Sequence, residues 1–150
     1  MTEKTAPMTL ALEEAAAAAA RGEVPVGAVV TGPDGAVLAS AGNRVEGDAD
    51  PTAHAEVLAL RAAAKALGTA HLVDCDLHVT LEPCAMCAQA ISLARVRRLV
   101  FGTYDPKGGG VEHGARVYAH PTCHHRPEVI GGVREGDAAA MLKAFFVDRR

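Results

Sequence analysis

The sequence predicts an α/β sandwich with one mixed sheet. Short apolar runs typical of strands alternate along the chain with longer Ala- and Leu-rich segments typical of helices, and this alternation favours helices packed on a sheet. Neither an internal repeat nor a linker-like stretch interrupts the 150 residues, a length that suits one domain with its own hydrophobic core. We therefore expect residues 1–150 to form a single domain.

The first elements are a helix and a β-hairpin. Residues 8–21 contain strong helix formers and stop at Gly22, which predicts a helix. Two short apolar runs, 26–31 and 36–40, flank the turn sequence Gly-Pro-Asp-Gly, and this pattern predicts two paired strands.

The next helix is long and has clear signals at both ends. Thr52 suits an N-cap and Gly68 suits a terminator, so residues 52–68 are expected to form it. The remaining elements are a strand, a helix, a strand, an irregular Gly- and His-rich region, a short apolar run and a last helix, at residues 76–82, 84–96, 97–102, 105–127, 128–133 and 137–150.

Composition narrows the class of protein. The formal net charge is −3, so no global basic field draws the chain to nucleic acid. A local cluster at Arg97 and Arg98 could still contact phosphates or cover a strand edge with charge. No apolar run approaches the roughly 20 residues needed to span a bilayer, and no signal peptide is evident. We expect a cytoplasmic protein with no membrane partner, whose cysteines are thiols or metal ligands.

The stretch Thr-Leu-Glu-Pro-Cys-Ala-Met-Cys places Cys84 and Cys87 three residues apart at the start of a predicted helix. Both sulfurs then lie on one helix face, and the free N–H groups of the first turn favour the thiolate form that binds zinc. Taken alone, such a pair fits a redox site, half of a metal site or plain packing equally well.

A second motif, His-Ala-Glu, decides between these alternatives. His54 and Glu56 begin another predicted helix, where both side chains can reach a point just beyond the helix end. His54, Cys84 and Cys87 would bind one Zn²⁺ and leave its fourth position open, which is typical of catalytic zinc. Glu56 would stand beside the metal and transfer protons. The combined pattern is the established signature of the zinc-dependent nucleobase deaminases.

With these motifs, the chain resembles the zinc-dependent cytidine deaminase superfamily, and within it the bacterial tRNA-specific adenosine deaminases. The blocks EVPVGAVV, DPTAHAEVLALR, VTLEPCAMCAQAI and RVRRLVFG carry the resemblance. It implies a cytidine deaminase-like, three-layer α-β-α sandwich with a mixed sheet of about five strands. It also implies a zinc-dependent hydrolase that converts adenosine to inosine at the wobble position of a tRNA anticodon, and a homodimer.

The same resemblance implies a set of substrate contacts. Asn43 would hydrogen-bond the base through its side-chain amide, and Val26 would line the base pocket. The backbone around Ala55, Glu82 and Pro83 would frame the attacking water and the leaving amine.

The loop after Gly102 departs from the family pattern. Tyr104 replaces a basic residue, and Gly-Val-Glu-His replaces a turn of small residues. This loop lies where the family holds the anticodon, so the pattern leaves the role of loop 108–114 undecided. The candidate substrate-loop contacts are Tyr104, Asp105, Lys107, His113 and His124.

Three functions therefore stay open from the sequence. The first is the tRNA adenosine deaminase, whose partner is an anticodon stem-loop. The second is a deaminase of a free nucleobase, nucleoside or related small heterocycle, which the altered loop and the acidic net charge favour. The third is a non-catalytic, zinc-stabilised binding module, in which the carboxylate of Glu56 would have no task.

Overall fold

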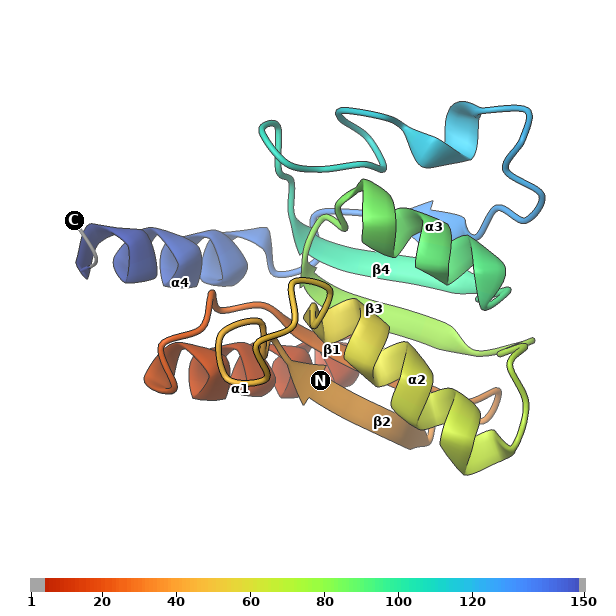
Figure 1. Ribbon diagram of the computed structural model, residues 1–150, viewed down its shortest axis with the longest axis horizontal. Helices are drawn as coiled ribbons and strands as arrows, with labels where there is room; N and C mark the ends of the chain where they lie inside the picture. Colours follow the sequence, from red (N-terminus) through yellow and green to blue (C-terminus); the bar gives the residue numbers. More distant parts are fainter. Residues whose placement is uncertain (1–4, 149–150) are drawn as a thin grey trace.

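The computed structural model describes residues 5–148 and has three layers, with one sheet between two pairs of helices (Figure 1). The strand order is β2-β1-β3-β4-β5, so the predicted mixed sheet of five strands is confirmed. β1 runs antiparallel to β2 and β3, whereas β3, β4 and β5 are parallel. The strands are β1 Gly27–Thr31, β2 Val37–Gly42, β3 Asp76–Leu81, β4 Arg98–Thr103 and β5 Glu128–Ile130.

The helices cover both faces of this sheet. α2 and α3 lie on one face, α1 and α4 on the other (Figure 1). Successive strand residues point to opposite faces, so Val30 packs under α2 and α3 while Val29 packs under α1, and neither is exposed. The helices are α1 Thr5–Ala20, α2 Ala55–Leu67, α3 Ala85–Leu93 and α4 Glu135–Asp148, with a short 3-10 helix, η1, at Val117–Ala119. The predicted last helix extends to Arg150, but residues 149–150 lie outside the described part of the chain.

The parallel pair β3 and β4 brings two functional segments to one sheet edge. The carboxyl ends of parallel neighbours meet at the same side. Leu81 therefore pairs with Thr103, and the N–H of Glu82 donates to the Thr103 carbonyl at 2.8 Å. The Cys-containing turn that follows β3 thus lies beside the Gly-rich loop that follows β4.

Two local predictions are wrong. The N-cap of α2 is His54 and not Thr52, because Asp50 accepts both the N–H and the hydroxyl of Thr52 and holds it in a turn before the helix. The strand-edge interpretation of Arg97 and Arg98 also fails, because β4 lies between β3 and β5.

The segment between β4 and β5 arches over α3 (Figure 1). Tyr118, in η1, fastens it there by donating its hydroxyl to the Ala88 carbonyl at 2.9 Å. Within residues 5–148, none of the helices combines the length and the apolar character that a bilayer crossing requires.

Candidate metal centre and active-site pocket

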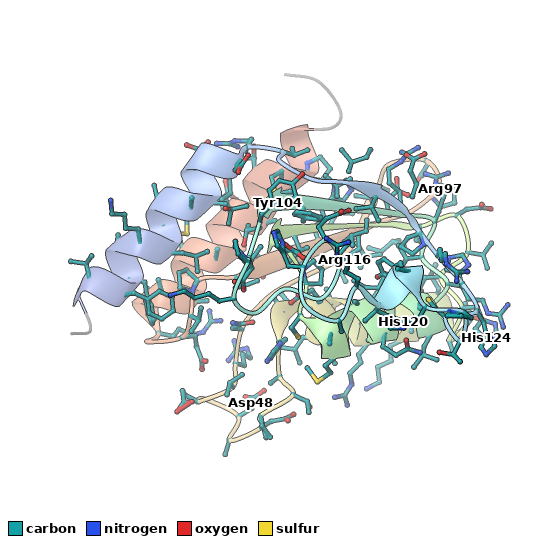
Figure 2. All side chains as sticks on the ribbon, turned by 90° about the horizontal axis from the view of Figure 1, so that it is seen from above. Asp48, Arg97, Tyr104, Arg116, His120 and His124 are labelled. Carbon is teal, nitrogen blue, oxygen red and sulfur yellow. The ribbon has the colours of Figure 1, made fainter. Side chains whose placement is uncertain are left out.

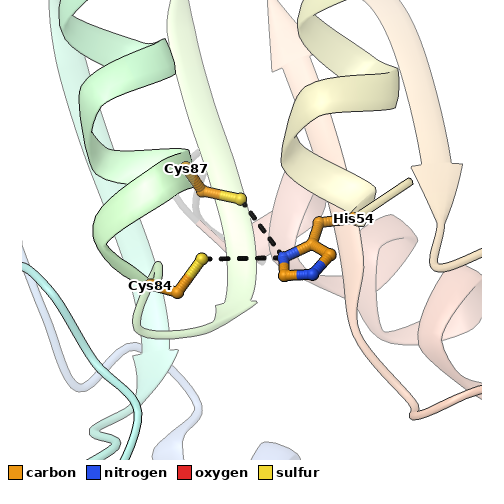
Figure 3. A group of neighbouring side chains, drawn as sticks. All are labelled: His54, Cys84 and Cys87. Carbon is orange, nitrogen blue, oxygen red and sulfur yellow. Dashed lines mark hydrogen bonds between the residues drawn. The ribbon is translucent and has the colours of Figure 1, made fainter. Parts of the chain in front are cut away.

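The two motifs converge on one point in space. His54 Nδ1 lies 3.6 Å from Cys84 Sγ and 3.5 Å from Cys87 Sγ, with the ring nitrogen facing both sulfurs (Figure 3). All three ligand atoms lie within 4.8 Å of one another. Among the residues that the structure describes, no other group of His, Cys, Asp and Glu side chains meets this spacing.

These spacings fit a zinc ion. A tetrahedral zinc has Zn–S bonds of about 2.3 Å and Zn–N bonds of about 2.0–2.1 Å, which place each sulfur about 3.5–3.6 Å from the nitrogen. The two observed N···S distances, 3.6 and 3.5 Å, match that edge length. One imidazole and two sulfurs are also a ligand set that zinc prefers, and with three protein ligands the fourth position stays open.

Two helix N-termini supply the ligands. His54 is the N-cap of α2 and Cys84 the N-cap of α3, both with extended backbone, and neither side chain caps its own helix. Asn43 replaces the missing cap of α2, because its Oδ1 accepts the Ala55 N–H at 2.8 Å. His54 is thereby left to bind metal, and an amide from the end of β2 stabilises the helix start.

The electrostatics of the cluster favour a bound cation. The hydrogen bond from Cys87, assisted by one from His54, lowers the pKa of Cys84 to about 4, although burial opposes the shift. The same sulfur–sulfur hydrogen bond, together with burial, raises the pKa of Cys87. The hydrogen bond to Cys84 likewise raises the pKa of His54. A cation at this point would stabilise both thiolates at once.

Glu56 lies beside the three ligands, with a side chain that is only 4% exposed. Burial raises its pKa to about 7, and the negative charge on Cys84 adds to this effect. A carboxyl group with a pKa near neutrality can both accept and release a proton during a reaction. Glu56 is therefore suited to carry a proton next to the metal.

A cavity of about 440 Å³ opens onto this cluster. Its wall combines the metal-site residues with apolar side chains and with further carboxylates from four separate segments, Glu23, Glu46, Glu82 and Asp105. The lining includes Glu23, Val24, Val26, Asn43, Val45, His54, Glu56, Leu81, Glu82, Cys84 and Asp105. A few convergent polar groups in a partly apolar cavity are typical of a small-ligand site.

The sequence profile of the cytidine and deoxycytidylate deaminase zinc-binding region matches residues 1–103. A tRNA-specific adenosine deaminase of Agrobacterium fabrum is 53% identical over 150 residues, which cover 100% of this chain and 98% of that protein. The chain belongs to the cytidine and deoxycytidylate deaminase family. His54, Cys84 and Cys87 form its zinc site.

Solved structures agree with this assignment. A structure from studies of A-to-I editing by tRNA:A34 deaminases at the wobble position of transfer RNA has a TM-score of 0.90 and 54% identity, and the match covers 92% of this chain and 99% of that one. A guanine deaminase from Nitrosomonas europaea has a TM-score of 0.81 but 26% identity, and covers 94% of this chain and 83% of that one. The chain is thus more similar to the tRNA:A34 deaminase than to the guanine deaminase.

Most of the remaining predicted site residues lie either beside the zinc ligands or along a neighbouring cavity. Ala55, directly after His54, and Pro83, directly before Cys84, are both buried. Tyr104, Asp105 and Lys107 line a second cavity of about 510 Å³, which shares Val24, Leu81 and Asp105 with the first.

His113 and His124 take different places. His113 Nδ1–H donates to the Glu82 carboxylate at 2.8 Å. His124 is exposed and lies far from Tyr104 at the other side of the molecule (Figure 2), so it is not brought to the cavity. Its contact with substrate stays a prediction.

One buried carboxylate was missed by the sequence analysis. Glu23 is 3% exposed and accepts the N–H groups of Glu46 and Gly47 at 3.2 and 2.8 Å. It holds the polar loop that closes one side of the cavity. Its only signal in the sequence is its position at the start of the block EVPVGAVV, which gives no hint of a partner more than 20 residues away.

Proposed function

We propose that this protein is a zinc-dependent hydrolase that converts adenosine to inosine at the wobble position of a tRNA anticodon. One observation carries the proposal: a complete set of three zinc ligands and an adjacent buried Glu56 opens onto a base-sized cavity. The full-length identity to a tRNA-specific adenosine deaminase supports the choice of substrate. Such a substrate implies a cytoplasmic enzyme.

The proposed chemistry assigns the proton transfers to Glu56. Held by these three ligands, zinc would act as a Lewis acid. It would lower the pKa of water so that hydroxide, the attacking group, is available at neutral pH. Glu56 takes the proton from the attacking water and gives a proton to the ring nitrogen beside C6 of the adenine. It then takes the proton of the hydroxyl group formed at C6 and gives it to the amine, which leaves as ammonia while the C6 carbonyl of inosine forms. A carboxyl with a pKa of about 7 suits both directions of transfer.

Base recognition falls to Asn43 and to the apolar wall. Because the Ala55 N–H can only donate, the amide atom that faces it is Oδ1, and the NH₂ group of the amide is the part that can donate to a base. Asn43 therefore contributes a donor to the adenine edge, and Val26 packs against the ring. The backbone at Ala55, Glu82 and Pro83 encloses the reacting carbon. Because the reacting carbon must leave the base stack, a single-stranded anticodon loop is a suitable substrate.

The test is inosine formation by the zinc-loaded protein on an anticodon stem-loop that carries adenosine at the wobble position. A matched stem-loop with guanosine at the wobble position and a panel of free bases and nucleosides serve as the other substrates, and Glu56→Gln is the enzyme blank. Inosine from the adenosine stem-loop alone is expected. Turnover of a free heterocycle alone would replace the proposal with the small-molecule deaminase.

The non-catalytic alternative makes a different prediction. A zinc-stabilised binding module would hold the metal with no turnover of any substrate, and Glu56→Gln would not alter its behaviour. The burial of a carboxyl beside an open metal position disfavours this alternative, since a structural zinc site normally has four protein ligands.

We also infer a homodimer, as the family resemblance implies. Large apolar side chains stay exposed on the α2–α3 layer of the single chain, with Leu93 at 68% and Leu67 at 45%. Sedimentation of the wild type and of Leu93→Lys tests this assignment. A dimer that the substitution weakens is expected, and a wild-type monomer at micromolar concentration would contradict it.

A further inference from the structure

The carboxylate of Glu82 is buried in the pocket wall and surrounded by donors. Its side chain is 0% exposed. Oε1 accepts the Asp105 N–H at 3.0 Å and contacts His113 Nδ1 at 2.8 Å. Oε2 accepts three consecutive backbone N–H groups, from Val111, Glu112 and His113, at 3.2, 2.8 and 3.1 Å. Consecutive N–H groups that converge on one oxygen form a concave anion site, and here the anion belongs to the protein.

These contacts require a carboxylate. Every backbone partner of Glu82 is a donor, so both side-chain atoms at this position must accept. Glutamine has nearly the same shape but would turn an NH₂ group toward at least one of the backbone N–H groups. A buried donor facing a donor leaves both without a partner.

The segment held by Glu82, loop 105–113, packs directly on the zinc-ligand turn. The Gly110 N–H donates to the Pro83 carbonyl at 2.8 Å. A Cβ at position 110 would lie 2.5 Å from the Ala85 nitrogen, and one at position 109 would lie 2.5 Å from Glu82 Cδ. Only glycine permits this approach of loop backbone to the turn that carries Cys84. The glycine run therefore serves close packing.

Loop 105–113 also forms the rim of the cavity. Asp105 borders both the zinc-site cavity and its neighbour, and Lys107 borders the second one. Glu82 itself has no exposed surface to offer a substrate, since both of its oxygens are used inside the protein. Any effect of the Glu82 side chain on the substrate must therefore pass through this loop.

We propose that Glu82 is a positioning residue for the RNA substrate: it fixes loop 105–113 against the zinc-ligand turn, and substrate affinity depends on that fixed loop. The inference rests on the proposed function for the identity of the substrate. The placement of the loop itself does not depend on it. The contact that the sequence suggests for residue 82 is made by its backbone, whereas the role proposed here for its side chain is indirect.

The experiment compares zinc-loaded wild type with Glu82→Gln and Glu82→Asp. Amide hydrogen exchange in the peptide covering 105–114 reports on the loop, and zinc content reports on the metal site. We expect Glu82→Gln to speed exchange in this peptide at least about tenfold, since one of the two acceptor oxygens becomes a donor, and to leave zinc content unchanged. Glu82→Asp keeps the charge and should restore part of the protection. Glu112→Gln removes the same charge from the same loop without removing an acceptor of its amides, so its loop exchange should match wild type.

A second pair of readouts excludes a merely structural role. The dissociation constant of the anticodon stem-loop should rise at least about tenfold in Glu82→Gln, while the single-turnover rate at saturating stem-loop should stay within about threefold of wild type. Unchanged loop exchange would overturn the inference. Faster loop exchange with an unchanged dissociation constant would also overturn it. A large loss of single-turnover rate with an unchanged dissociation constant would do the same.

His113→Ala keeps the inference testable if Glu82→Gln fails to fold. This substitution removes only the ring contact, from a side chain that is 34% exposed, so it spares the core. A smaller rise in exchange, confined to the same peptide, is expected, and none would count against the inference. A wild type that does not bind the stem-loop would overturn the proposed function and the substrate half of the inference, whereas loop exchange would still decide whether Glu82 holds the loop.

Discussion

Two buried glutamates that line one cavity have opposite electrostatic environments. Glu56 is 4% exposed and Glu82 is 1% exposed, so burial penalises the charge of both. For Glu56 burial dominates and raises the pKa to about 7. For Glu82 the N–H of Asp105, the His113 ring and the other loop N–H groups outweigh burial, and the pKa is lowered.

The difference shows that burial alone does not set the role of a carboxyl group. A buried carboxyl with few donors changes its protonation near neutrality, which suits proton transfer. A buried carboxylate with many donors keeps its charge and fixes the segments that donate to it. One of the two carboxyl groups thus suits proton transfer, and the other suits the positioning of a loop.

The largest effect on activity is expected when a zinc ligand is removed. Cys87→Ala removes a fully buried ligand, so zinc content should fall to below about a tenth of one ion per chain and inosine formation should disappear. Elemental analysis and a stem-loop assay check this. Cys75→Ala is the matched control, because it removes another buried thiol at the far end of β3 and should keep both zinc and activity. Retention of zinc by Cys87→Ala would contradict the ligand set.

Glu56→Gln should lower the rate of deamination by about 10²–10⁴-fold, because it removes the proton carrier and little else. Zinc content and stem-loop affinity should match wild type. Single-turnover kinetics with a parallel binding assay provide the measurement. A wild-type rate in Glu56→Gln would contradict the assignment of proton transfer to Glu56.

Asn43 allows a finer test, since it caps α2 and we propose that it also faces the base. Asn43→Ala should lose about 1 kcal/mol of unfolding free energy through the lost cap, and about tenfold in substrate affinity through the lost donor. Asn43→Asp keeps the acceptor for Ala55, so it should lose affinity while retaining the helix. Urea unfolding and stem-loop binding separate the two effects. Equal stability of both variants would argue against the capping role.

His78, a buried histidine within β3, extends the comparison to a basic side chain. Burial lowers its pKa to about 4 from 6.5, and its Nδ1 has no partner among the described residues. Between these pKa values the unfolded chain binds a proton that the folded protein does not. The free energy of unfolding should therefore fall as the pH falls from 6.5 toward 4, by at most about 1.4 kcal/mol per pH unit from this group.

Urea unfolding of wild type and His78→Gln between pH 7 and pH 5 isolates this contribution, since the variant cannot titrate at that position. The stability of the variant should depend less steeply on pH than that of wild type. Equal pH dependence would show that His78 is not held neutral by burial.

The metal site could be predicted from the sequence because its geometry is local. His54 and Glu56, and likewise Cys84 and Cys87, are placed by the first turn of one helix each, so their spacing along the chain determines their spacing in space. The alternation of apolar runs similarly determined the layers of the fold.

The supporting contacts could not be predicted, because their partners are distant in sequence. Asn43 caps a helix that begins 12 residues later, and Glu82 holds amides 23 to 31 residues away. No short motif encodes either pair. Arg97 and Arg98 show the same limit: Asp76 pairs with both across the strand ends, at 3.0 and 3.5 Å, and only the sheet order reveals that neighbour.

The most direct test of the division between the two glutamates is one single-turnover series on the adenosine stem-loop, with Glu56→Gln and Glu82→Gln measured side by side across stem-loop concentration. Our account predicts a reduced maximal rate with an unchanged half-saturating concentration for Glu56→Gln. For Glu82→Gln it predicts the reverse, a raised half-saturating concentration with a nearly unchanged maximal rate. A loss of maximal rate in both variants, with equal half-saturating concentrations, would contradict it.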